Sequence, residues 1–310
     1  MLTTLLSLLP AKTAVAHVGR WQIEDSWWLA WHFDASVAFN LFVLSALYVA
    51  GVVRLWRRTG IGQAITGWQV TTFGAGILAL AIALLSPLDA LGNELSWVHM
   101  TQHMVLMVVA APLIMAGVPG RILLWGMPTG MRPFVSRCLR PRTGPLGRGL
   151  RFVVWNPIWI WSLHAVVLWG WHLPRLYQSA LQSPPVHDLE HLMFFVVACL
   201  FWRVVLDVRT HAALHPTVGV LYLFTTSLHC MLLGVLMALA PRLWYPVYQG
   251  RTEPWGLAPL EDQQIAGLIM WMPGCLVYAV VAALLFGRWL SQPQQRPSKA
   301  IRRPAPYAGP

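Results

Sequence analysis

Seven apolar stretches of about 20 residues recur along the chain, and an α-helix needs that length to cross the hydrocarbon core of a bilayer. Of the 310 residues, 57% are hydrophobic and 11% charged, whereas soluble domains carry roughly 25% charged residues. Short connections separate the stretches. We therefore expect an all-α membrane protein, a bundle of seven transmembrane helices near residues 31–53, 68–86, 97–118, 152–173, 187–206, 217–240 and 263–287.

The basic residues lie mostly on one side of this predicted bundle. Seventeen of the 22 Lys and Arg residues follow the first and third stretches, lie near the end of the fifth, or follow the seventh. Connections rich in Lys and Arg stay in the cytoplasm, so the pattern predicts an N-terminus outside and a C-terminus in the cytoplasm. Among the eleven acidic residues only Asp207 falls on the cytoplasmic side. Topology thus explains the net charge of +11 without a nucleic acid partner.

Two end segments flank the predicted transmembrane domain at 31–290. Residues 1–30 are either an export signal or a periplasmic segment, and the first sixteen leave both readings open. They have a short apolar core and a small-residue end but no basic residue before the core. Residues 291–310 are rich in Pro and Arg and have little to bury, so we expect a disordered cytoplasmic tail.

Histidines mark the outer ends of three predicted helices. Two HxxxH pairs enter the third and fifth stretches from the outer side, and two further histidines lie eight residues apart at the end of the fourth. Residues four apart lie on one helix face, so each HxxxH pair presents both imidazoles in one direction. Polar groups are costly in lipid and should face one another inside the bundle. The candidate metal ligands are His99, His103, His164, His172, His187 and His191.

Methionines near these histidines favour copper as the metal. Imidazole binds Zn, Cu, Fe and Ni, whereas thioether and thiolate ligands select Cu(I). Met100 and Met107 lie beside the His99–His103 pair, and the sixth stretch contains His229-Cys230-Met231. Methionine is also ordinary packing in an apolar helix, and the four cysteines form no CxC or CxxC pair. We expect Cu(I), bound by imidazoles with methionines as exchangeable ligands.

Other interpretations of the same residues stay open. HDLEH (187–191) fits the inverted zinc-protease pattern HxxEH, although no soluble catalytic domain surrounds it. His103 and His191 lie at similar depths on separate helices, which is compatible with a bis-histidine haem. Each histidine on its own is also compatible with a hydrogen-bonded residue of the bundle.

Three segments, in this order and spacing, resemble the CtaG-type cytochrome c oxidase assembly proteins, the multi-pass family associated with oxidases of the caa type. The segments are SPLDALGNELSWVHMTQHMVLMVVAAPLIMAGVP (86–119), WGWHLPRLYQSAL (169–181) with HDLEHLMFF (187–195), and LEDQQIAGLIMWMPG (260–274). The resemblance extends from the second predicted helix to the seventh. The order of segments is more specific than any single HxxxH pair.

The resemblance implies a non-enzymatic factor of the bacterial inner (plasma) membrane that delivers copper to a haem–copper oxidase. Its partners would be oxidase subunits, membrane lipid and a periplasmic copper donor. Ligand imidazoles must be neutral, so copper affinity should fall below about pH 6. A haem- or metal-dependent redox enzyme and a metal-free assembly scaffold remain the alternatives. The residues implicated are His99, His103, His172, His187 and His191, with Asp262 and Met270 as weaker companions.

Overall fold

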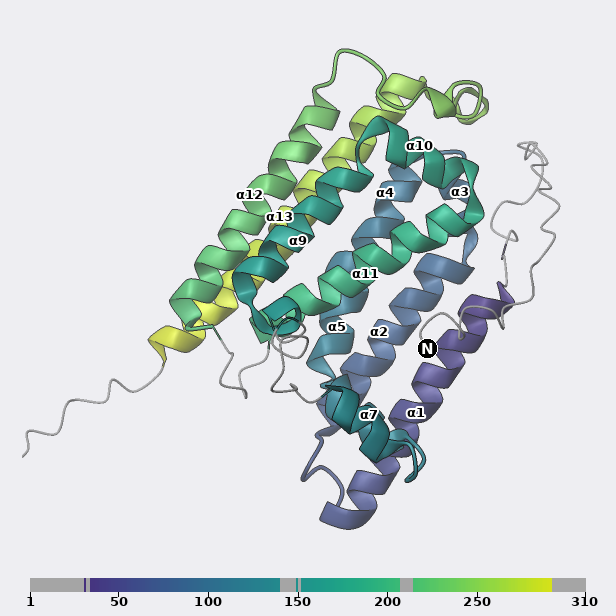
Figure 1. The fold of residues 1–310 in the computed structure, drawn as a ribbon. Helices are drawn as coiled ribbons and strands as arrows, with labels where there is room; N and C mark the ends of the chain where they lie inside the picture. The colour runs from purple at the N-terminus through teal and green to yellow at the C-terminus, as the bar shows by residue number, and fades with distance from the viewer. Residues whose placement is uncertain (1–30, 32–33, 140–148, 150–151, 207–213, 292–310) are drawn as a thin grey trace, which may run out of the picture.

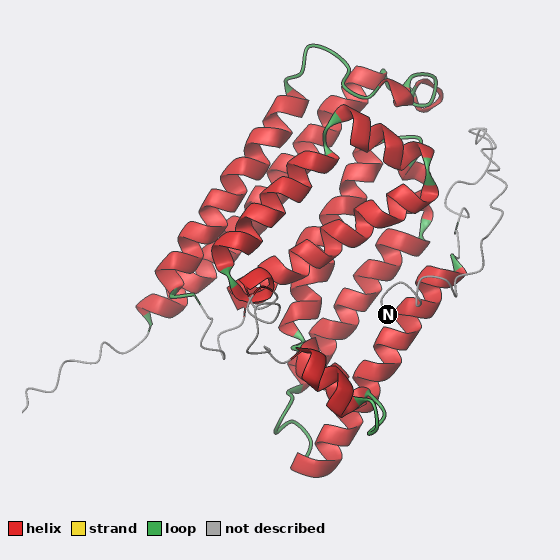
Figure 2. Cartoon of the chain, in the orientation of Figure 1, coloured by secondary structure: helices red, strands yellow, loops and turns green. Residues whose placement is uncertain are grey.

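The computed structural model describes residues 31, 34–139, 149, 152–206 and 214–291, and within these ranges the chain is helical and contains no strand (Figure 1, Figure 2). The predicted export segment (1–30), nearly all of the predicted tail (292–310) and Asp207 lie outside the described residues.

Six helical segments are long and apolar enough to cross a membrane, which makes the chain a multi-pass membrane protein. They are α1 (Ala35–Thr59), α2 (Gly67–Leu85), the continuous segment Ser96–Ala116, α11 (Pro184–Leu206), α12 (Pro216–Ala238) and α13 (Pro259–Leu290). The third segment comprises α4 (Ser96–Met104), the π-helix η2 (Val105–Ala110) and α5 (Ala111–Ala116). Shorter helices connect them: α3 (Pro87–Gly92), α6 (Pro119–Gly126), α7 (Arg132–Leu139), α10 (Pro174–Gln182) and the 3₁₀ turns η3 (Pro246–Tyr248) and η4 (Glu253–Trp255).

The fourth predicted span is shorter than expected. In place of 152–173, α9 runs over Pro157–Trp171, 15 residues or about 22 Å, while the hydrocarbon core is about 30 Å thick. Asn156 begins the helix, because its side chain accepts a hydrogen bond from the Trp159 N–H at 3.1 Å, and Pro157 occupies the first turn. A polar cap followed by proline ends the preceding segment, so the apolar run is divided.

The π-helix in the third span has a local cause. Pro112 lacks an N–H and its ring clashes with the carbonyl one turn earlier, which disturbs an α-helix. Here the Ala111 N–H bonds to the Leu106 carbonyl, five residues before it. The Met107 carbonyl, five residues before Pro112, accepts instead from the Trp202 indole N–H at 2.8 Å.

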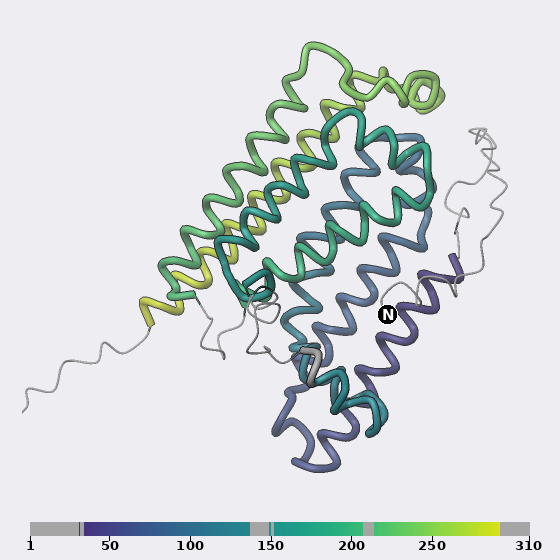
Figure 3. Tube along the Cα trace, in the orientation of Figure 1, coloured from purple at the N-terminus to yellow at the C-terminus, as the bar shows by residue number. Residues whose placement is uncertain are grey.

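The helices run back and forth so that several of their ends gather together. The trace shows α4, α11 and α13 starting at the end of the bundle where α2, α9 and α12 finish (Figure 1, Figure 3). The short helices α3 and α10 lie at this same end. All six predicted metal-ligating histidines lie on α4, on α11, or on α9 and its C-cap.

Close helix packing depends on glycine where α12 and α13 meet. A Cβ on Gly267 would lie 2.5 Å from the Ala238 nitrogen, and a Cβ on Gly234 would lie 2.9 Å from the Gly267 carbonyl oxygen. Small residues let membrane helices approach at backbone distance. This pair fixes α13, whose N-terminal turn in turn holds the start of α4.

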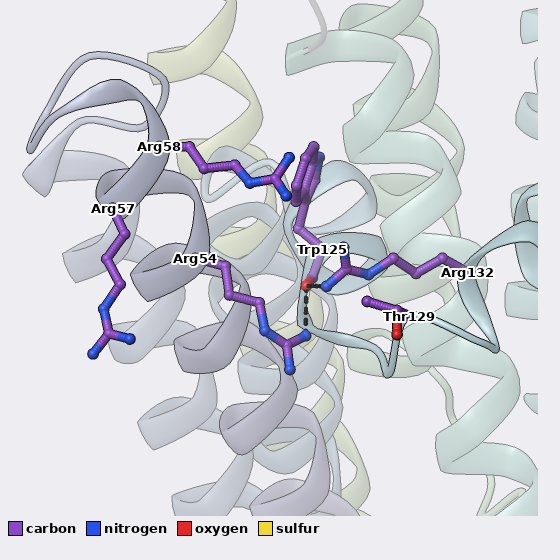
Figure 4. A pocket seen from close by; sticks show the side chains of 6 residues that line it. All are labelled: Arg54, Arg57, Arg58, Trp125, Thr129 and Arg132. Atoms are coloured by element: carbon purple, nitrogen blue, oxygen red, sulfur yellow. Dashed lines mark hydrogen bonds between the residues drawn. The ribbon is translucent and has the colours of Figure 1, made fainter.

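The opposite end of the bundle is rich in arginine. A pocket of about 300 Å³ there is lined by Arg54, Arg57, Arg58, Trp125, Thr129 and Arg132 (Figure 4). Arg54 Nη1 lies 2.7–2.9 Å from the carbonyl oxygens of Trp125, Gly126 and Met127, and Arg132 also donates to the Trp125 carbonyl. These guanidinium groups satisfy the carbonyls that the end of α6 leaves without helical partners.

Candidate metal centre

The start of α4 is fixed by a carboxylate from another helix. Its N-cap residue, Leu95, offers no side-chain hydrogen bond, so the first N–H groups of the helix need another acceptor. Asp262 of α13 fills this role, accepting from the N–H of Ser96 at 2.6 Å and of Trp97 at 3.2 Å. Asp262 therefore holds in place the helix that carries His99 and His103.

The α11 segment HDLEH places three polar side chains on one face. His187, Glu190 and His191 are at positions i, i+3 and i+4, which share a side of a helix. All three are buried, and Glu190 is 0% exposed. The intervening Asp188 and Leu189 are exposed.

The imidazoles of α4 and α11 meet inside the bundle. Ring centroids lie 4.2 Å apart for His99 and His103 and 4.1 Å apart for His187 and His191. Across the two helices, the His99–His187 and His103–His191 centroids are both 5.3 Å apart. The four rings thus form one group, with each pair facing the other.

Two carboxylates complete this group. Glu190 Oε2 lies 3.7 Å from His99 Nε2, and Glu190 Oε1 lies 4.0 Å from His103 Nε2. Two ligand atoms that each bind one ion at about 2.0–2.1 Å lie about 3.3 Å apart in tetrahedral and about 4.1 Å apart in linear geometry. Asp89 of α3 stands beside the other pair, with one ligand atom each of Asp89, His187 and His191 within 4.8 Å of one another. We call His99, His103, His187, His191, Glu190 and Asp89 the histidine cluster.

The cluster holds polar atoms that the described residues leave unpaired. Buried polar groups normally have a hydrogen-bond partner, and an unpaired one costs about 1–3 kcal/mol. Buried atoms without one include both ring nitrogens of His99 and His103, Nε2 of His187 and His191, and both carboxylate oxygens of Glu190. Lone pairs and negative charge that converge in this way fit a cation.

His172 adds a further candidate metal ligand next to the cluster. Its Nδ1 lies 2.7 Å from the Leu168 carbonyl oxygen, which can only accept, so Nδ1 carries the proton. Nε2 therefore keeps a lone pair, and it is buried without a hydrogen-bond partner among the described residues. Tyr177 and Phe194 each contact the His172 ring and one cluster ring. The hydrogen bond from His172 Nδ1 to the Leu168 carbonyl is of the kind that orients a metal-binding imidazole.

Three buried tyrosines close the end of the site. Tyr177 stacks on Tyr245 at 3.8 Å between centroids, and its hydroxyl lies 3.2 Å from that of Tyr248 and 3.3 Å from Ser96 Oγ. Tyr245 donates to the His172 carbonyl at 2.9 Å, and Tyr248 donates to the Gly92 carbonyl at 3.1 Å. Burial raises the pKa of all three phenols well above the usual value of 10, so they stay neutral donors.

The remaining predicted ligands have other described neighbours. Met100, Met107 and Met270 are buried in the apolar core that also contains Trp202 and Phe194, and Phe194 contacts the His103 and His172 rings. Asp262 caps α4, as described above. His164 groups instead with His229 and Cys230 on α12.

Sequence reasoning missed the two carboxylates. Glu190 was visible in HDLEH, where its spacing from His187 and His191 already placed it on their face. Asp89 lies in the short helix α3, and its approach depends on how α3 folds back over α4. Gln102 fixes that approach by donating to Asp89 Oδ1 at 2.8 Å and to the Ala83 carbonyl at 2.9 Å.

A comparison with known families identifies the family of the chain. The family model described as "Cytochrome c oxidase caa3 assembly factor (Caa3_CtaG)" matches residues 46–292. The chain belongs to this family. The matched range contains every residue of the histidine cluster, together with His172 and the three tyrosines of the assembly factor.

Among curated proteins, uncharacterized proteins of Mycobacterium bovis and Mycobacterium tuberculosis are each 23% identical over 281 residues, which cover 88% of this chain and 41% of theirs. An uncharacterized protein of Mycobacterium leprae is 23% identical over 271 residues, covering 84% and 40%. The chain thus spans about two fifths of the length of these relatives. No solved structure matches the chain.

Proposed function

We propose that this assembly factor binds a copper ion in the histidine cluster and delivers it to a subunit of a haem–copper oxidase. The observation that carries the proposal is the convergence of unpaired imidazole nitrogens and a buried carboxylate from α4 and α11. The family's description as a cytochrome c oxidase assembly factor supports an oxidase as the destination. The protein acts by binding and transfer and not as an enzyme.

The ligands of the histidine cluster suit an ion that is bound and then transferred. Imidazole nitrogen binds copper well, and the Glu190 carboxylate offsets the charge that the ion brings into the membrane. The His172 ring contacts Tyr177 and Phe194, which also contact the cluster, and its Nε2 would supply a ligand to an ion leaving it. Transfer by ligand exchange changes no oxidation state: each bond to a cluster ligand is replaced by a bond to the receiving subunit.

We further propose that α9 is a seventh, short membrane crossing, and that the cluster lies near the periplasmic side of a bacterial inner membrane. Seven crossings put the two termini on opposite sides of the membrane. The distribution of Lys and Arg then favours an N-terminus outside and an arginine-rich pocket around Trp125 that faces the cytoplasm. The copper donor would then be periplasmic.

A copper titration of the purified full chain tests the binding proposal. The metal-free protein is titrated with Cu(II), and separately with Cu(I) kept reduced, in competition with a chromogenic chelator. Because loss of even a supporting residue lowers metal affinity about 10- to 100-fold, we expect His99→Ala/His103→Ala to weaken binding by on the order of 100-fold or more. His215→Ala, which removes an exposed histidine at the start of α12, should bind copper as the wild type does.

Equal binding by the wild type and the double variant would remove α4 from the site. A wild-type protein that binds no copper would support the metal-free scaffold. For delivery, copper-loaded protein is mixed with a copper-depleted oxidase catalytic subunit, and the copper content of the separated subunit is measured. We expect the subunit to gain copper from the wild type and not from the double variant.

A metal-dependent redox enzyme is the second candidate, favoured by one observation. The cluster contains two adjacent three-ligand groups, His99–His103–Glu190 and Asp89–His187–His191, and paired sites of this kind occur in dinuclear redox centres. Two ions bound within the histidine cluster, with oxygen consumption by the loaded protein, would favour this function. A haem between His103 and His191 is not favoured, since their rings meet edge to face at 5.3 Å and leave no width for a porphyrin.

A further inference from the structure

A second group of metal-ligating side chains lies outside the histidine cluster, between α9 and α12. Ligand atoms of His164, His229 and Cys230 all lie within 4.8 Å of one another. His164 comes from the middle of α9, and His229 and Cys230 come from the middle of α12. The ring centroids of His164 and His229 are 5.5 Å apart.

The group contains polar atoms that the described part of the chain leaves unpaired. His164 is 1% exposed, and its Nδ1 has no hydrogen-bond partner among the described residues. The same holds for His229 Nε2 and for Trp161 Nε1, whose ring contacts His229 at 5.4 Å. A weak hydrogen bond between Cys230 Sγ and His229 Nδ1, 3.8 Å apart, would account for those two atoms but leaves His164 Nδ1 without a partner.

The geometry points to a second metal site, formed by His164, His229 and Cys230 and selective for Cu(I). A thiolate sulfur bound at about 2.3 Å and an imidazole nitrogen bound at about 2.0 Å to one ion lie about 3.5 Å apart in tetrahedral and about 4.3 Å apart in linear geometry. The 3.8 Å between Cys230 Sγ and His229 Nδ1 falls in this range.

The choice of ion follows from the number and softness of the ligands. Thiolate selects Cu(I) and zinc, but a structural zinc ion takes four ligands. The group offers three, and the Trp161 indole has an N–H and no lone pair, so it cannot be a fourth. On binding, a copper–sulfur bond replaces the S–H bond of Cys230 and the proton goes to a water or buffer base, without any redox change.

This site is separate from the histidine cluster but connected to it by one helix. His164 and His172 are eight residues apart, which is about 12 Å along α9. Phe194 contacts the His103 and His172 rings, and Phe201, two turns further along α11, contacts the His164 ring at 5.1 Å. Because His229 is partly exposed on α12, the second site reaches the lateral surface of the bundle.

The inference goes beyond the proposed function, and its test separates the two. The full chain in detergent is saturated with Cu(I), and the ultraviolet thiolate-to-copper charge-transfer band and the copper content are measured. We expect this band in the wild type, in the cluster variant His99→Ala/His103→Ala, and in the matched thiol control Cys199→Ser. In Cys230→Ser we expect the band to disappear and about one equivalent of copper to be lost.

Absence of the band in the copper-saturated wild type, which needs no variant, would overturn the inference. So would a band that persists in Cys230→Ser. A band present in the wild type but absent from a folded His99→Ala/His103→Ala would assign the thiolate to the cluster and also contradict a separate site. If the cluster variant keeps both the band and all of its copper, the proposed function fails while the second site stands.

Discussion

Glu190 shows at the scale of a single residue why the histidine cluster calls for a cation. Its carboxylate is fully buried and faces two imidazoles, and both of its oxygens lack a hydrogen-bond donor among the described residues. A buried carboxyl group without a hydrogen-bond partner is costly, whereas a bound cation turns the same group into a stabilising ligand. The cluster therefore costs the metal-free protein stability that an ion restores.

Glu190→Gln tests this reasoning, because it keeps the shape of the side chain and removes its charge. We expect the metal-free variant to unfold at a temperature no lower than the wild type, since a buried carboxyl group without a hydrogen-bond partner is replaced by a neutral amide. Copper affinity should fall by at least about tenfold, and the rise in unfolding temperature on adding copper should shrink accordingly.

The control for this variant is Glu253→Gln, at an exposed position in η4. It should change neither quantity. A Glu190→Gln protein that is strongly destabilised without metal, yet binds copper as tightly as the wild type, would show that Glu190 is a structural acceptor.

At the scale of the elements, sequence patterns predicted the helices well and their interruptions poorly. The ends of α2, α11 and α12 lie within three residues of the predicted spans, because apolar runs and prolines mark them. Asn156 and Pro157 cause the break before α9. A count of apolar residues over the whole stretch does not detect this break. The π-helix before Pro112 was not predicted, and the Trp202 indole that satisfies the Met107 carbonyl comes from a helix far away in sequence.

Helix geometry also explains which site residues were predictable. Residues four apart differ by about 40° around the helix axis, so each HxxxH pair shares a direction. His164 and His172, eight apart, differ by about 80°. Hence His172 lies beside the cluster while His164 turns towards α12, although both were expected at one site. The rotation of each helix about its axis depends on tertiary packing, which the spacing of residues in one chain does not give.

At the scale of the whole molecule, the two ends of the bundle differ in chemistry. The histidine cluster and the buried tyrosines lie at the end where α4, α11 and α13 begin, and the arginine pocket lies at the other (Figure 1, Figure 4). This separation matches a protein that exchanges an ion on one side of the membrane and anchors its basic end on the other.

Cysteine accessibility checks the proposed orientation. Gln182, at the end of α10, and Ser291, after α13, are exposed at opposite ends of the bundle. A membrane-impermeant thiol reagent added to intact cells should label Gln182→Cys and leave Ser291→Cys unlabelled until the membrane is opened. The reverse labelling would place the cluster on the cytoplasmic side and exclude a periplasmic copper donor.

The central claim is that imidazoles of α4 and α11 hold one copper ion together with Glu190. Anomalous diffraction at the copper absorption edge, from crystals of the copper-loaded full chain, locates such an ion directly. We predict a peak about 2.0–2.2 Å from His99 and His103 ring nitrogens and a Glu190 oxygen. Copper bound only at other residues, with the cluster free of anomalous signal, would contradict the account.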